Sequence, residues 1–193
     1  MCWSYEVSLF TGLFSYVVAG LLYRRDKNYD KWLAMFIFVF STIQWLEAIL
    51  WKNTGINNIN YYITKYAIPF VLSIEGITAL YGASLYKPVP TELFVIYFVY
   101  TVLIFYLCMN NFNYTKISTN NLQWTQQQNI LIGAIYAVFL ALPFVLYMDG
   151  ITKYIIVGGI IGTLLYSIIL YQHAWHSNWC FFANIVNIVL LLT

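Results

Sequence analysis

Charged residues are scarce in this 193-residue chain, in which Asp, Glu, Lys and Arg together make up 8% of the sequence. Soluble globular domains carry about 25% charged residues, so the composition excludes a soluble enzyme and a disordered chain. Nine basic and seven acidic residues leave a net charge of +2, which is too small for the dense basic face that nucleic-acid binding needs. Three cysteines are too few to form a disulfide framework.

Hydrophobic residues fill the place of the missing charges. They make up 62% of the chain, and the mean hydropathy is +0.72. Since a transmembrane helix needs about 20 mostly apolar residues, the runs between polar breaks predict an all-α fold, a single seven-transmembrane-helix bundle over residues 1–193. The expected helices cover about 5–23, 31–51, 61–86, 91–109, 130–148, 152–172 and 178–193, and the longest polar stretch, 110–129, separates the fourth from the fifth.

The few basic residues predict the orientation of this multi-pass protein. Cytoplasmic loops of membrane proteins carry an excess of Lys and Arg. With the N-terminus outside, the inner loops hold Arg24, Arg25, Lys27, Lys31, Lys87 and Lys153. The outer side then holds Lys52, Lys65 and Lys116. We therefore expect the N-terminus outside and the C-terminus in the cytoplasm, with the lipid bilayer as the main partner and no nucleic acid.

Gly158 and Gly162 lie four residues apart on the sixth expected helix. Small residues at this spacing let another helix approach closely. We interpret the pair as an internal packing contact, with the interface of a homo-oligomer as the alternative.

Two glutamates lie inside the apolar runs, where an ionisable residue is expensive and usually faces the bundle interior or a water-filled cavity. Glu47 lies roughly 24 Å along the second helix from Lys31, toward the outer side. Gln44 and Trp51 share its helical face. This face could bind a cation, a proton or a polar head group, or Glu47 could be a structural carboxylate hydrogen-bonded to other helices.

Glu75 lies near the middle of the third helix, among small residues that indicate a central and closely packed position. No Lys or Arg lies at a matching depth, so a buried ion pair is not expected. The position fits two interpretations equally well: proton handling, or a neutral Glu75 hydrogen-bonded to a neighbouring carbonyl group.

His173 and His176 join the sixth and seventh helices on the expected outer side, and Cys180 follows them. Cys2 belongs to the same side, and Glu47 lies toward it. Imidazole, thiolate and carboxylate groups are ligands of zinc or copper. The alternatives are a Cys2–Cys180 disulfide and plain hydrogen-bonded interface residues.

Three motifs in order carry a resemblance to a known group of proteins. They are Met1-Cys2-Trp3-Ser4 with Ser8, Gln44-x-x-Glu47-x-x-x-Trp51, and Ser177-x-Trp179-Cys180-Phe181-Phe182. Together they resemble an uncharacterised family of small multi-pass membrane proteins of algae and giant viruses, and this resemblance implies a viral or host cell membrane as the location. The chain is more distantly similar to a bacterial multi-pass family that opens Met-Cys-Phe-Ser, from which it departs at Trp3 and Ala48. The resemblance implies membership and marks the motif residues, but it implies no mechanism.

Taken together, these features predict a channel or transporter-like protein for a proton, a cation or a small polar solute. Glu75 would act near the midplane, with Gln44, Glu47 and Trp51 at an outer vestibule. One alternative is a membrane enzyme acting on lipid, with a zinc or copper ion at the outer face. A further alternative is a structural or assembly protein of the membrane.

Overall fold

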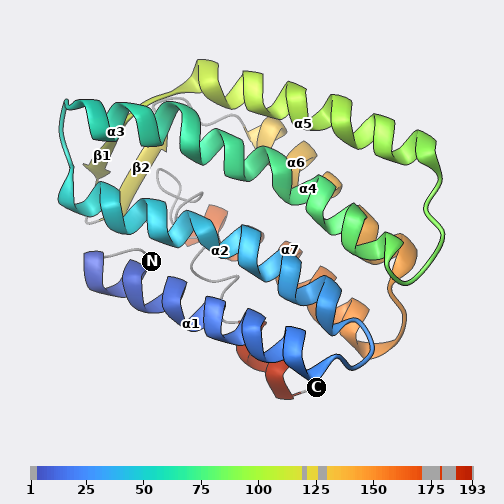
Figure 1. Cartoon of the computed structure of the whole chain (residues 1–193). Coiled ribbons are helices and arrows are strands. Elements are labelled where there is room, and N and C mark those ends of the chain that lie inside the picture. Colours follow the sequence, from blue (N-terminus) through green and yellow to red (C-terminus); the bar gives the residue numbers. More distant parts are fainter. Residues whose placement is uncertain (1–3, 119–120, 126–129, 171–178, 180–185, 193) are drawn as a thin grey trace.

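The computed structural model describes residues 4–118, 121–125, 130–170, 179 and 186–192 (Figure 1). Within these ranges the chain is predominantly helical, as the sequence predicts. The helices are α1 (Tyr5–Arg25), α2 (Asp30–Lys52), α3 (Asn58–Tyr62), the π-helix η1 (Ile63–Ala67), α4 (Ile68–Ser84), α5 (Thr91–Asn111), α6 (Ile130–Tyr147) and α7 (Gly150–Leu170), and residues 186–192 are also helical.

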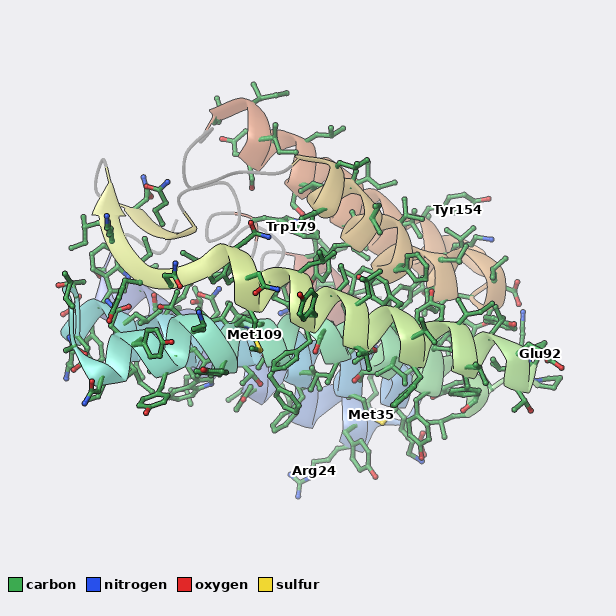
Figure 2. All side chains as sticks on the ribbon, turned by 90° about the horizontal axis from the view of Figure 1, so that it is seen from above. Arg24, Met35, Glu92, Met109, Tyr154 and Trp179 are labelled. Atoms are coloured by element: carbon green, nitrogen blue, oxygen red, sulfur yellow. The ribbon has the colours of Figure 1, made fainter. Side chains whose placement is uncertain are left out.

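The long helices run side by side in two layers (Figures 1 and 2). Helices α1, α2, α4 and α5 form one layer in chain order, each in contact with the next. Helices α6 and α7 form the second layer and contact each other, and α6 also packs on α4. Helix α4 therefore contacts its neighbours in the first layer and α6 in the second. It is the central helix that its small residues predict.

Five helices of the described residues are long and apolar enough to cross a membrane: Tyr5–Arg25, Asp30–Lys52, Asn58–Ser84, Thr91–Asn111 and Gly150–Leu170. The apolar helix Leu131–Tyr147 is shorter. These helices match six of the expected spans to within a few residues. The seventh expected span, 178–193, lies largely outside the described residues, so the count of seven stays a prediction.

A π-helical segment interrupts the third expected span. Asn58–Ser84 is continuous, but its turn Ile63–Ala67 is a π-helix that leads into Pro69, near the start of α4. Proline has no backbone N–H and its ring clashes with the preceding turn. A widened turn relieves that clash and keeps the helix continuous.

The polar stretch that follows α5 contains a β-hairpin, which is an addition to the expected all-α fold. Strands β1 (Phe112–Ser118) and β2 (Asn121–Thr125) pair antiparallel. Leu122 and Trp124, two residues apart and so on one face of β2, are both buried. Short polar strands of this kind give a much weaker sequence signal than an apolar helix.

A buried hydrogen-bond network docks this hairpin on the bundle. The Asn60 side chain accepts from the backbone N–H of Thr115 (2.8 Å) and donates to its carbonyl oxygen (2.9 Å). The hydroxyls of Thr64 and Thr115 are 2.7 Å apart. The backbone groups that a strand edge leaves open are thereby satisfied inside the protein.

The loops that connect α1 to α2, α4 to α5, and α6 to α7 gather at one end of the bundle, which we call the basic end. Lys87 bonds to Asp149 there, and the Tyr29 hydroxyl contacts the same carboxylate. The six basic residues expected on the inner side lie in or next to these loops. The other three lie toward the hairpin end, where Lys52 covers the Tyr5 ring (3.9 Å) and Lys65 bonds to Asn113. The basic residues are therefore divided between the two ends of the bundle as the sequence predicts.

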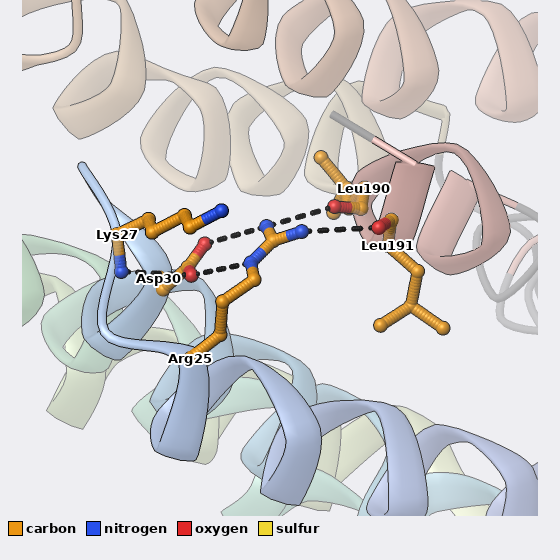
Figure 3. A network of polar contacts seen from close by, with 5 residues as sticks. All are labelled: Arg25, Lys27, Asp30, Leu190 and Leu191. Carbon is orange, nitrogen blue, oxygen red and sulfur yellow. Dashed lines mark hydrogen bonds and ion pairs between the residues drawn. The ribbon is translucent and has the colours of Figure 1, made fainter.

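The last described residues return to the basic end (Figure 3). Arg25 forms a two-pronged ion pair with Asp30 (2.7 and 2.8 Å) and donates to the carbonyl oxygens of Leu191 (3.0 Å) and Leu190 (3.2 Å). Carbonyl groups at a helix C-terminus have no partner within the helix. The Arg25 guanidinium group supplies hydrogen-bond donors to two such carbonyl groups, and it thereby holds residues 186–192 beside the end of α1.

The interpretation of Gly158 and Gly162 as an internal packing contact is wrong. Both are exposed, and a Cβ added at either would meet nothing within 4 Å. The glycine of α7 that packs closely is Gly159, against Val186. Gly158 and Gly162 thus lie on the exposed face of α7. A homo-oligomer interface through these two glycines stays a prediction.

Candidate functional site

Glu75 of α4 is fully buried near the middle of the bundle. Trp32 of α2 lies against Gly82, and the two helices are antiparallel. Glu75, seven residues before Gly82, is therefore level with about Val39, close to the centre of Asp30–Lys52. Neither Lys nor Arg pairs with it, since the three ion pairs found in the described ranges all lie at the basic end.

The hydroxyl of Tyr136, on α6, donates a hydrogen bond to Oε2 of Glu75. The second carboxyl oxygen, Oε1, is buried and has no hydrogen-bond partner in the described structure. The hydrogen-bond partner of Glu75 is therefore a phenol and not the carbonyl group that the alternative interpretation expected. This bond also links the two layers of the bundle.

Aromatic rings from α5 and α6 pack together beside Gly76, the residue after Glu75. The Tyr100 ring stacks on Phe139 at 4.0 Å between centroids and 3° between planes. The Tyr97 hydroxyl donates to the Phe139 carbonyl oxygen (2.9 Å). Gly76 makes room for them, since a Cβ there would lie 3.2 Å from Cε1 of Tyr100. We call Glu75, Gly76, Tyr97, Tyr100, Tyr136 and Phe139 the Glu75 cluster.

Trp179 packs against the Tyr136 ring. The two rings meet edge to face, with centroids 5.4 Å apart and planes at 87°. The indole N–H donates to the Thr163 hydroxyl of α7 (3.0 Å). This motif residue, labelled in Figure 2, therefore packs on the tyrosine that holds Glu75.

A second polar group lies between α1 and α2. Gln44 and Glu47 are fully buried, and the Thr11 hydroxyl donates to Gln44 Oε1 (2.9 Å). Ser8 is one turn before Thr11 and is also fully buried. Trp51, expected to cover this face, is partly buried in α2. We call Ser8, Thr11, Gln44 and Glu47 the Gln44 cluster.

The two buried glutamates lie at different depths. Glu75 is level with Val39 of α2, whereas Glu47 is eight residues further toward the hairpin end. At 1.5 Å per residue this is an axial separation of about 12 Å. The two carboxyl groups therefore belong to separate sites.

The residues of the expected metal site, Cys2, His173, His176 and Cys180, lie outside the described residues. Within the described ranges, groups of three or more His, Cys, Asp or Glu side chains able to hold a metal ion are absent. The zinc or copper hypothesis for the outer face stays a prediction. Cys108 is a free, buried thiol in α5.

Sequence reasoning missed the tyrosines that surround Glu75. Tyr136 and Tyr100 lie inside apolar runs of a chain with 18 tyrosines, so neither stands out by composition. The burial of a tyrosine in the middle of a span is the available signal, because its hydroxyl then needs a polar partner. The identity of that partner depends on the packing of three helices.

Comparison with other proteins gives one relative at low identity. The chain is 23% identical to an uncharacterized protein of Acanthamoeba polyphaga mimivirus over 229 aligned positions, which cover 99% of this chain and 94% of that protein. No protein-family model matches the sequence. No solved structure matches it. The likeness extends over nearly the whole of both chains, and it is consistent with the giant-virus side of the resemblance noted above; the bacterial side stays a prediction.

Proposed function

We propose that this chain is a multi-pass membrane protein of the transporter type that binds and moves a proton, with Glu75 as the proton-binding group. The observation that carries the proposal is the place of Glu75, fully buried at mid-depth with Tyr136 as its hydrogen-bond donor. An ionisable group at such a depth is costly, and in membrane proteins it commonly marks a proton or ion pathway.

The neighbours of Glu75 favour a proton over a metal cation. Hard cations such as Ca²⁺ need six to eight oxygen ligands, and Mg²⁺ needs six. The rings of Tyr97 and Tyr100 lie instead against Gly76, the residue after Glu75, and both rings contact Phe139. A carboxyl group that exchanges one proton needs only hydrogen-bonding neighbours, which Tyr136 supplies.

The closure of the bundle around the carboxyl groups favours a transporter over an open channel. Glu75 and Glu47 both have no exposed surface. In this proposal the Gln44 cluster is the vestibule group nearer the hairpin end, and Glu75 is reached from one side at a time. A change between two helix arrangements is then needed for each transport event.

The distribution of basic residues supports the basic end as the cytoplasmic end. Cysteines introduced at Asn57 and at Pro88, in a variant whose native cysteines are replaced by serine, test this orientation in intact cells. An impermeant maleimide should label N57C and not P88C. The reverse pattern would overturn the orientation but not the role of Glu75.

Proton flux into proteoliposomes tests the proposed function. A pH-sensitive dye inside the vesicles reports the flux under an imposed proton gradient, with potassium and valinomycin fixing the membrane potential. We expect the wild-type protein to carry protons faster than protein-free vesicles, and a sodium gradient alone to drive no flux. No proton flux above protein-free vesicles would overturn the proposal and favour a structural role in the membrane.

A further inference from the structure

Two buried polar atoms of the Glu75 cluster have no hydrogen-bond partner among the described residues. They are Oε1 of Glu75 and the hydroxyl oxygen of Tyr100. Both residues are buried, Glu75 completely and Tyr100 to all but 4% of its surface. Leaving a buried polar group unpaired is costly, so two such atoms in one cluster indicate a missing partner.

Gly76 lets α5 approach α4 closely, which brings Tyr100 next to the residue that follows Glu75. The Tyr100 ring lies against Gly76, the residue after Glu75. Stacking on Phe139 fixes the plane of the Tyr100 ring, so its hydroxyl cannot turn away to find another partner.

We propose that a single water molecule is bound between the Tyr100 hydroxyl and Glu75 Oε1, and that Tyr100 is the residue that positions it. The two sites on the protein are a phenol, which donates and accepts, and a carboxyl oxygen. A water molecule matches both, and buried waters typically bond to polar groups that the protein leaves unsatisfied. The carboxyl group of Glu75 then has Tyr136 on one oxygen and the water on the other.

The water site gives the proton of Glu75 a route that does not pass through Tyr136. A proton on Oε1 would be hydrogen-bonded to the water, which faces α5, while Tyr136 faces α6. This role in proton movement rests on the proposed function, whereas the binding of the water does not. The site therefore has a spectroscopic test that needs no transport activity.

Tyr97 provides a matched control for Tyr100. It lies three residues earlier on the same helix, it is buried, and its ring also lies near Gly76. Its hydroxyl, however, bonds to the carbonyl oxygen of Phe139. Tyr97→Phe and Tyr100→Phe thus remove the same atom from neighbouring tyrosines, and only the second removes a proposed ligand of the water.

Infrared spectra of the purified protein in lipid, recorded in H₂¹⁶O and in H₂¹⁸O, test the site. We expect the wild-type protein to show an O–H stretching band of a bound water that shifts with the oxygen isotope. The band should be absent from Tyr100→Phe and present in Tyr97→Phe. Gly76→Ala, which pushes on the Tyr100 ring, should shift or remove it.

The results separate this inference from the proposed function. An isotope-sensitive band that persists unchanged in Tyr100→Phe, or no such band in the wild type, would overturn the water site even if the protein carries protons. The expected band pattern in a protein without proton flux would support the water site and overturn the transport proposal. Circular dichroism of each variant checks that the fold is retained, and the Gly76→Ala spectrum gives a second reading should Tyr100→Phe fail to fold.

Discussion

The hydroxyl of Tyr136 donates a hydrogen bond to the buried carboxyl group of Glu75, although 61 residues separate them in the chain. Each residue supplies the hydrogen-bond partner that the other needs. A tyrosine hydroxyl inside an apolar helix needs a polar partner, and a carboxyl group at mid-depth needs a donor. The bond therefore joins α4 and α6 as well as defining the candidate site.

Replacing Tyr136 by phenylalanine should destabilise the protein. The substitution leaves a buried carboxyl oxygen without its donor, so we expect the free energy of unfolding to fall by about 1–3 kcal/mol. Denaturant unfolding in detergent measures the change, with Tyr106→Phe, on an exposed side chain, as the control. In a double-mutant cycle with Glu75→Met, Tyr136→Phe should cost less than it does alone, and strict additivity would contradict a direct interaction.

Gly82 is expected to tolerate no side chain. A Cβ there would overlap the Trp32 ring, which is fully buried and stacks on Phe144 at 4.9 Å. We expect Gly82→Ala to lower the free energy of unfolding by about 1–3 kcal/mol or more, the usual cost of overpacking. Gly20→Ala on α1, where a Cβ meets nothing within 4 Å, should leave thermal stability unchanged or raise it. Equal effects of the two substitutions would contradict the packing of α2 on α4.

The ion pair at the basic end should stabilise the protein over a wide pH range. The hydrogen bond from Lys87 lowers the pKa of Asp149 below its ordinary 3.8, with Lys153 and Tyr29 adding to the effect. The same bond raises the pKa of Lys87 above its ordinary 10.5. The contribution of Asp149 is therefore present above pH 3.8 and lost as the pH falls below it, and that of Lys87 is present below pH 10.5 and lost as the pH rises above it.

Melting temperatures of the wild type and Lys87→Met across this range measure the contribution. We expect a small advantage of the wild type that is constant between these limits, shrinks outside them, and weakens in high salt because the pair is exposed. Lys116→Met, at the hairpin end, serves as the control. An advantage that changes with pH near neutrality would point to another group.

The sequence predicted the long helices well and the contacts between them poorly. Apolar runs such as 91–109 have the length and composition of a membrane-crossing helix, and their bounds agree with the structure to within a few residues. The hairpin that Thr115 anchors and the face on which Gly158 lies depend on packing between distant elements. Glu75 was found because a charge inside a span is rare, whereas Tyr136 and Tyr100 became visible only once three helices were placed together.

The most direct test of the central claim compares two glutamine variants of the same chain in the proton-flux assay. Glu75→Gln removes the buried carboxyl group, and Glu92→Gln removes an exposed one in the first turn of α5. The account predicts that proton flux in Glu75→Gln falls to the level of protein-free vesicles while Glu92→Gln matches the wild type. Equal flux in the two variants would contradict it.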